Sequence, residues 1–149
     1  MAAKGSVYAN DILALIFNGT AITNLAQNGV SPLTTLYMSL HTANPHTTAG
    51  SGTVDTQNAS EAAYGSYARQ PVNRDGTGFN VSAAAVNLVT LLQFPQASSG
   101  SETETYFGVG VAVSGATKLL YWGTITPNIV VATGITPELT TAANLVTET

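Results

Sequence analysis

The chain has 149 residues, a formal net charge of -4 and no cysteine, and only 8% of its residues are charged. This length suits one domain with a sizeable core, and four basic residues are too few to neutralise a run of nucleic-acid phosphates. The lack of cysteine excludes disulfides and thiolate metal sites. A surface with few ions repels its neighbours weakly, which favours a protein held permanently in an assembly. We therefore expect a single domain over residues 1–149 that binds no nucleic acid.

The N-terminal segment Ser6–Asn18 has the clearest helical pattern. Ile12 and Ile16 repeat near the helical period, Ser6 can cap the start, and Gly19 is placed to end the helix. The apolar run ILALIF lacks a basic flank and is too short to span a bilayer. We expect a short helix here, and neither a signal peptide nor contact with a membrane.

The stretch LYMSLHTANP begins with the strict two-residue alternation of a β-strand. Alternate side chains should lie on opposite faces: Leu36, Met38 and Leu40 toward the core, and Tyr37, Ser39 and His41 away from it. A metal site at His41 would need further ligands that the sequence does not bring together. We expect the imidazole to bond a neighbouring backbone group at the end of the strand instead.

A long segment without periodicity follows from residue 42 to residue 64, and Pro, Gly, Ser, Asn and Thr dominate it. Loops of this length in a compact domain are usually functional or disordered. We expect this loop to lie outside the core and to drape over neighbouring subunits. Arg69 follows it, and a bidentate bond to a carboxylate, or bonds to backbone carbonyls, would pin the loop base or a partner.

The rest of the chain predicts short strands separated by turn signals. They are Ala68 to Val72, Phe79 to Ser82, Val86 to Phe94, Thr105 to Val113, Lys118 to Thr124 and Ile129 to Ala132. The turn SGAT joins two of them into a hairpin, and residues 135–149 form either a last strand or an extended arm. The expected fold is mainly β, an antiparallel β-sandwich or jelly roll with one short N-terminal helix.

Two glycines, Gly108 and Gly110, share one face of this hairpin. Because they carry no side chain, we expect a backbone or a bulky ring against that face, with Tyr121 and Trp122 as candidates. Trp122 is accordingly placed near the core. The predicted core also contains Leu36, Met38, Leu40, Val109, Val111 and Leu120.

No pattern in the sequence predicts catalysis. There is no Gly-x-Ser-x-Gly elbow, and the two Gly-x-Gly triplets lack the other residues of a phosphate-binding loop. Glu102 and Glu104 stand in a turn rich in Ser and Gly, so we interpret them as a solvated hairpin end and not as paired catalytic carboxylates. We expect no catalytic residue, no cofactor and no bound metal.

An ordered set of short motifs resembles a group of small tailed-bacteriophage virion proteins, often labelled tail-fibre or head-decoration proteins. The motifs are a Leu-Tyr-x-x-Leu-His-Thr strand before an Asn-Pro turn, a Tyr-x-Arg segment, and a Phe-Pro-x-Ala strand end leading into a Phe-Gly strand. The matching positions, within about residues 10–126, are Leu36, Tyr37, Leu40, His41, Thr42, Asn44, Pro45, Tyr67, Arg69, Phe94, Pro95, Ala97, Phe107 and Gly108.

The resemblance implies a structural virion protein that is not an enzyme. The first expectation is a capsid decoration or cement protein on the outer surface of the capsid, made in the host bacterial cytoplasm. It would bridge and stabilise subunits of the major capsid protein and associate with itself as a dimer or trimer. The low charge, single-domain length and lack of a trimerising shaft favour this reading. The alternative is a tail-associated adaptor or a receptor-binding module for a host glycan. The expected interface residues are His41, Asn44, Pro45, His46, Asp55, Tyr67 and Arg69.

Overall fold

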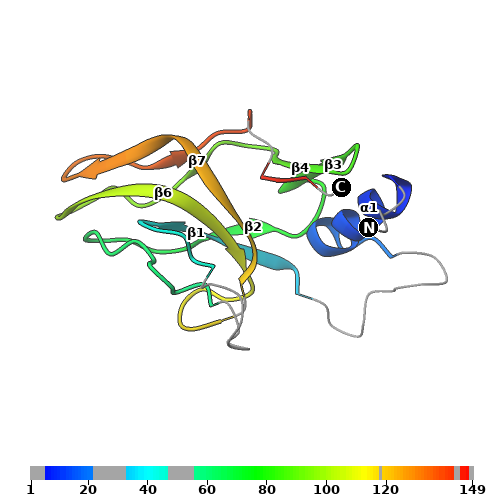
Figure 1. The fold of residues 1–149 in the computed structure, drawn as a ribbon, viewed down its shortest axis with the longest axis horizontal. Helices are drawn as coiled ribbons and strands as arrows, with labels where there is room; N and C mark the ends of the chain where they lie inside the picture. Colours follow the sequence, from blue (N-terminus) through cyan, green and yellow to red (C-terminus); the bar gives the residue numbers. More distant parts are fainter. Residues whose placement is uncertain (1–5, 22–32, 47–55, 118, 143–144, 148–149) are drawn as a thin grey trace. The chain divides into compact units, whose positions relative to one another are not determined.

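The computed structural model describes residues 6–21, 33–46, 56–117, 119–142 and 145–147. The architecture is mainly β, with antiparallel sheets and one short N-terminal helix, which confirms the predicted class (Figure 1). The chain divides into two compact units, Met1–Leu36 with Val72–Leu91 and Thr140–Thr149, and Tyr37–Pro71 with Leu92–Leu139. The sandwich arrangement and the single domain stay predictions. None of the described helices is both long and apolar enough to cross a membrane.

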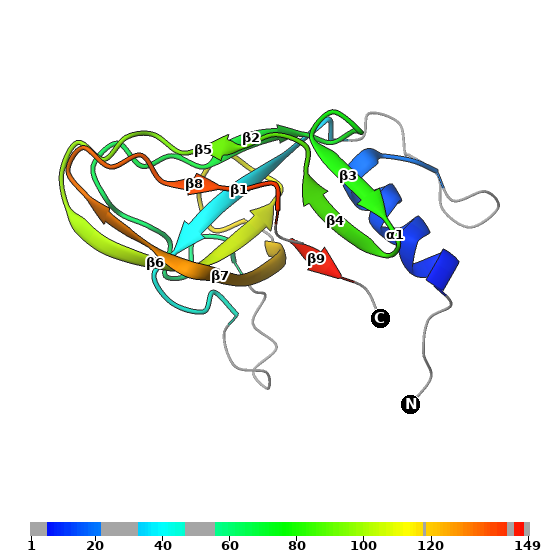
Figure 2. The same cartoon turned by 90° about the horizontal axis from the view of Figure 1, so that it is seen from above.

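The first unit is a small sheet with a helix packed on it. Helix α1 (Ser6–Asn18) has the predicted bounds and ends where Gly19 adopts a positive φ of 63°. Strands β3 (Phe79–Ser82), β4 (Ala85–Leu88) and β9 (Val146–Thr147) form an antiparallel sheet in the order β3-β4-β9 (Figure 2). The buried Phe17 of the helix meets Phe79 edge-on, with ring centroids 4.8 Å apart.

One arginine fastens the end of this helix. The last carbonyls of a helix have no partner within it. Here the Arg74 guanidinium donates to the carbonyl oxygens of Leu15 and Ile16, and also to that of Leu33 at 3.1 Å. A cation at a helix C-terminus also interacts favourably with the helix dipole. Arg74 is thereby committed to internal bonds.

The main sheet has four strands in the order β2-β1-β6-β7. They are β2 (Gln70–Asn73), β1 (Thr35–His41), β6 (Ser101–Gly110) and β7 (Leu119–Ala132), and the division between the units falls within β1 and β2. Strands β6 and β7 pair as the predicted antiparallel hairpin and run side by side in both views (Figures 1 and 2). The sequence predicted two strands, one before and one after the TPN turn. The structure has a single strand, β7, in place of both, and its pairing with β6 changes register near that turn.

The C-terminal region contributes strands to two sheets. Strand β8 (Glu138–Leu139) pairs with β5 (Leu92–Gln93), and β9 pairs with β4. The sequence predicted either a last strand or an extended arm for residues 135–149. The described part of this region forms strands. The strand expected from Val86 to Phe94 is divided into β4 and β5 because the chain bends at residues 89 and 90.

The apolar core agrees with the prediction in β1 but not at two positions of the hairpin. Met38, Leu40 and Val109 are fully buried, and Leu36 nearly so. Val111 is only half-buried because β6 ends at Gly110 and the chain then bends. Leu120 is also half-buried, since an irregularity in the hairpin pairs Gly110 with Leu119 and turns Leu119 inward instead.

A second irregularity overturns the reading of the two glutamates as solvated. The pairing of β6 with β7 shifts between Glu104 and Tyr106. A one-residue change of register exchanges the faces of a strand. Glu104 is consequently fully buried and Glu102 half-buried, while Phe107 and Val109 are buried beyond the shift.

Candidate functional site

The face of β1 opposite the apolar core is covered, although the sequence predicts it to point away from the core. Ser39 and His41 have 0% exposure. The last part of the long loop, residues 56–64, returns along the end of β1, and we call it the returning segment. There the Thr42 N–H donates to the Ser60 carbonyl and the Ala62 N–H to the Leu40 carbonyl, both at 2.9 Å. The prediction that the loop lies outside the core is therefore wrong for its last part.

That returning segment carries buried side chains of its own. Gln57 is fully buried, and Ala62 and Tyr64 are nearly so. The Gln57 N–H donates to the Thr117 carbonyl at 2.8 Å, which ties the segment to the turn between β6 and β7. A hydrophobic pattern could not reveal this, because a glutamine is buried here through hydrogen bonds.

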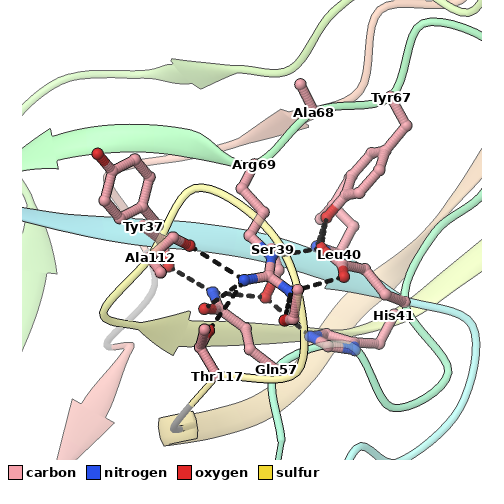
Figure 3. Close-up of polar contacts among 12 residues, drawn as sticks. Tyr37, Ser39, Leu40, His41, Gln57, Tyr67, Ala68, Arg69, Ala112 and Thr117 are labelled. Carbon is pink, nitrogen blue, oxygen red and sulfur yellow. Dashed lines mark hydrogen bonds and ion pairs between the residues drawn. The ribbon is translucent and has the colours of Figure 1, made fainter.

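Arg69 is the centre of the polar network on this face (Figure 3). Its Nε and Nη2 donate to the two carboxylate oxygens of Glu61 at 2.7 and 2.8 Å. Its remaining bonds go to Gln57 Oε1, the Ala112 carbonyl, Thr117 Oγ1 and the Gly115 carbonyl, at 3.1, 3.0, 3.2 and 2.8 Å. The guanidinium is thus buried with a carboxylate and four further acceptors. The predicted bidentate bond at the loop base is confirmed.

Gln57 connects this arginine to β1. Its Nε2 donates to the Tyr37 carbonyl at 2.7 Å and to Ser39 Oγ at 3.1 Å, while its Oε1 accepts from Arg69. The two ends of the amide are distinguished by these neighbours, since a carbonyl can only accept and a guanidinium can only donate. The side chain therefore has one orientation.

His41 has the predicted capping role. Its Nδ1 lies 2.8 Å from the Ala59 carbonyl, which can only accept, so Nδ1 carries the proton. Burial lowers the pKa of His41 and favours the neutral ring, and Nε2 accepts from the Ser39 hydroxyl at 2.9 Å. The imidazole therefore joins the end of β1 to the returning segment.

Tyr67 completes the network from the side of β1. Its hydroxyl donates to Glu61 Oε1 at 2.9 Å and accepts the Leu40 N–H at 3.1 Å. Burial, and then the nearby Glu61 carboxylate, raise the pKa of Tyr67 well above its ordinary value. The phenol therefore stays protonated and keeps its donor bond.

The two glycines of β6 make room for this network. A Cβ at Gly110 would lie 1.9 Å from Gln57 Oε1, and a Cβ at Gly108 would lie 2.6 Å from both His41 Nε2 and Ser39 Oγ. The expectation of a group packed on the glycines is confirmed, but the candidates were wrong. The groups are the His41 ring and the Gln57 amide, not Tyr121 or Trp122.

The chemistry open to this network is limited by its burial. Ser39 and His41 have the arrangement of a nucleophile and its base, yet both are fully buried and no substrate can reach them. The described residues contain no group of three or more potential metal ligands. What the network does in the structure is to connect β1, the returning segment and the turn between β6 and β7 through buried hydrogen bonds.

A cluster of aromatic rings lies on that surface. Trp122 is 39% exposed, so its predicted place near the core is wrong. The His46 ring stacks on it with centroids 5.6 Å apart and planes 10° apart, and the Tyr106 ring is tilted against it at 5.9 Å. Trp122 pairs with Gly108 across the hairpin. It therefore lies on the same face of the sheet as the polar network, beyond the part that the network covers. We call Trp122, His46 and Tyr106 the aromatic cluster.

Short polar bonds hold the loop that carries His46. The His46 N–H donates to Asn44 Oδ1 at 2.9 Å, and the Thr105 hydroxyl donates to the Thr42 carbonyl at 2.9 Å. The second bond attaches the loop to β6, next to Tyr106. The cluster is therefore held from both the loop and the hairpin.

The structure separates the predicted interface residues into several environments. His41, Pro45 and Arg69 are buried, Tyr67 and His46 are half-buried, and Asn44 is exposed. Asp55 lies outside the described residues. Their role as an interface stays a prediction. The sequence did not identify Gln57, Glu61 or Tyr106 as part of the site. For Gln57 the available signal was the pair of glycines in β6, which indicates that some group packs closely there but not which residue it is.

The comparisons with known proteins decide the broad function. Residues 4–147 match a family described as Podophage GP4 fiber I protein gp80. The chain belongs to this family. A comparison with curated proteins gave no match. The chain is therefore a structural component of a bacteriophage virion, a fibre protein and not an enzyme, as the resemblance implied.

Membership in a fibre family also corrects the leading expectation. It supports the tail-associated alternative and not the capsid decoration protein. Bridging of the major capsid protein and a place on the outer capsid surface lose their support with it. The reason for the error is physical: low charge and compact size suit any subunit held in an assembly, so they do not distinguish head from tail.

Proposed function

We propose that this chain is a receptor-binding module of the tail fibre, and that the aromatic cluster contacts a glycan on the host surface. The observation that carries the proposal is the exposed Trp122, with His46 stacked on it and Tyr106 beside it. Exposed aromatic rings on a rigid frame supply large contact area at little entropic cost. Sugar rings present C–H groups that pack on such surfaces.

Neither arginine of the chain is free to bind an acidic sugar, which favours an uncharged glycan. Recognition of an acidic sugar commonly uses a bidentate arginine. Arg69 is committed to Glu61 and its other acceptors, and Arg74 to carbonyls at the end of α1. Two exposed groups next to the rings are neutral: Thr124, which pairs with Tyr106, and Asn44, which accepts the His46 N–H.

The support beneath the cluster explains why the polar network is buried. A binding surface gains affinity when its groups are held in place before the ligand arrives. His41 pairs with Tyr106 across β1 and β6, and Ser39 pairs with Gly108, which in turn pairs with Trp122. The network therefore fixes the strands that present two of the three rings.

The chain provides its own reporter for a test, because Trp122 is its single tryptophan. Surface polysaccharide extracted from the host strain is titrated into the protein while tryptophan emission is recorded. We expect a saturable change in emission, and we expect Tyr106→Ala to weaken binding by about tenfold or more. The matched control is Val130→Ala, which removes a 68% exposed side chain from the same strand, β7, away from the cluster.

Trp122→Ala is examined by a pull-down on immobilised polysaccharide, because it removes the reporter. Loss of binding in both cluster variants with normal binding by Val130→Ala supports the proposal. Retention of binding by Trp122→Ala, or no binding by the unmodified protein, overturns it and favours an adaptor role within the tail.

A further inference from the structure

A second buried charged site lies on β6, away from the Arg69 network and independent of the proposed function. Glu104 has 0% exposure, and neither of its carboxylate oxygens has a hydrogen-bond partner among the described residues. Glu102 stands two residues earlier on the same strand and is half-buried. We call these two residues the acid pair.

Glu102 is already engaged with the backbone. Its Oε1 accepts the N–H groups of Ala63 and Tyr64, each at 2.9 Å. These two amides lie at the end of the returning segment, just before Tyr67 and Arg69. Glu102 therefore attaches that segment to β6, and it acts there as an acceptor.

Within the described parts of the chain, no donor bonds the Glu104 carboxyl to stabilise a negative charge. The titratable groups that face it are Glu102 on its own strand and Tyr64 on the returning segment. The Tyr64 hydroxyl donates its proton to the Pro95 carbonyl at 3.1 Å, so it is not available to Glu104. No described lysine or arginine bonds the carboxyl. An ionised carboxylate in such a place is very costly, whereas a protonated one can itself donate a hydrogen bond.

We propose that Glu104 is protonated in the folded protein at neutral pH and donates its proton to Glu102, so that the acid pair forms a latch that alkaline conditions open. The latch holds the returning segment against β6 through the two amides bound by Glu102. The proton on Glu104 avoids a buried negative charge beside the Glu102 carboxyl.

The direction of the pH dependence follows from the two states of Glu104. Burial, and the Glu102 carboxyl beside it, raise the pKa of Glu104 from 4.5 to about 8 in the folded chain. Between these values the folded state holds a proton that the unfolded state has lost. Stability is thus greatest below pH 4.5 as far as this group is concerned, and it declines as pH rises toward 8. Within that window the folding equilibrium constant falls by up to about tenfold per pH unit.

The direct measurement is the titration of glutamate side-chain carboxyls in the unmodified protein by carbon-detected NMR. The Glu104 resonance is assigned by its absence in Glu104→Gln. We expect one carboxyl to titrate with a midpoint near pH 8. A Glu104 resonance that titrates near pH 4.5 overturns the proposal, and so does one that calcium shifts, since a bound cation would then replace the proton.

Denaturant unfolding at a series of pH values provides the second readout. Glu104→Gln keeps the shape and the donor of a protonated glutamate, so we expect it to remove the fall in stability between pH 6 and pH 8. The control is Glu138→Gln, since Glu138 is exposed and accepts a surface bond from Gln93 at 2.6 Å. It should keep the fall in full. Equal slopes in the two variants would contradict the latch.

Discussion

Both faces of strand β1 are buried from residue 38 to residue 41, but they are covered by opposite chemistry. On one face, Met38 and Leu40 are packed in an apolar core. On the other, Ser39 and His41 are covered by a glutamine and an ion pair. Apolar contacts are many, individually weak and without direction. The polar face depends on a few directed bonds, each of which has a single suitable partner.

This difference explains how the two faces should respond to change. Removing a methyl group from the apolar face costs free energy in proportion to the lost contacts and the remaining cavity. Removing one partner from the polar face leaves the others buried without bonds, and that penalty falls on several groups together. The polar face should therefore be least tolerant of substitution where one residue bonds several buried partners, as Arg69 does.

The largest effect is expected at Arg69. Arg69→Ala removes a donor from the Glu61 carboxylate, the Gln57 amide oxygen and two carbonyls, and it leaves Glu61 without its opposite charge. Loss of one partner from a buried ion pair typically costs about 3 to 5 kcal/mol. Chemical denaturation monitored by circular dichroism measures the free energy of unfolding.

Arg69→Lys is the informative companion to that variant. Lysine keeps the charge, but it lacks the planar fork that reaches both Glu61 oxygens and the acceptors on the other side. We expect it to recover less than half of the loss. If lysine recovered the full free energy of unfolding, charge alone would stabilise the polar face, and directed hydrogen bonds would not be needed.

The apolar face supplies the next prediction. Leu40→Ala should lower the free energy of unfolding by about 2 to 5 kcal/mol, because Leu40 is fully buried and its removal leaves a cavity.

From the sequence, His41→Ala is expected to cost much less, as a change on an outward face. The structure revises that expectation to about 1 to 3 kcal/mol, since Ser39 and the Ala59 carbonyl lose a buried partner.

Thermal and denaturant unfolding should therefore show similar losses of stability in Leu40→Ala and His41→Ala. A His41→Ala variant as stable as the parent would mean that the polar face is covered without being energetically important. A Leu40→Ala variant that unfolds like the parent would contradict the strand register itself.

The sequence predicted the parts of the fold that depend on local pattern. The helix from Ser6 to Asn18, strand β3 and the β6–β7 hairpin follow from periodicity and turn residues, and the structure confirms them. The alternation in β1 correctly placed Met38 and Leu40 in the core. The same alternation could not predict what covers the other face, because the covering residue Gln57 lies about twenty positions away in the chain.

Two of the failures concern the register of the hairpin. Leu120 was placed by extending a two-residue alternation, and Glu104 by the Ser- and Gly-rich sequence around it. Shifts in the pairing of β6 with β7 change which side chains turn inward at both positions. A shift costs little free energy and leaves no strong mark in the sequence.

The site was harder to predict than the fold for a related reason. A polar network depends on contacts between segments far apart in sequence, and hydrophobicity does not report them.

The smallest effect that still distinguishes the faces is expected at Gly110. A Cβ there would lie 1.9 Å from Gln57 Oε1 and 2.3 Å from its Cδ, and Gln57 cannot move without losing Tyr37, Ser39 or Arg69. We expect Gly110→Ala to lower the free energy of unfolding by about 1 to 3 kcal/mol, as overpacking does in a core. The control is Gly76→Ala, where a Cβ meets nothing within 4 Å, and its stability should match the parent or exceed it slightly. If Gly110→Ala matched Gly76→Ala in denaturant unfolding, Gln57 would be adjustable, and the polar face would resemble the apolar one in its tolerance.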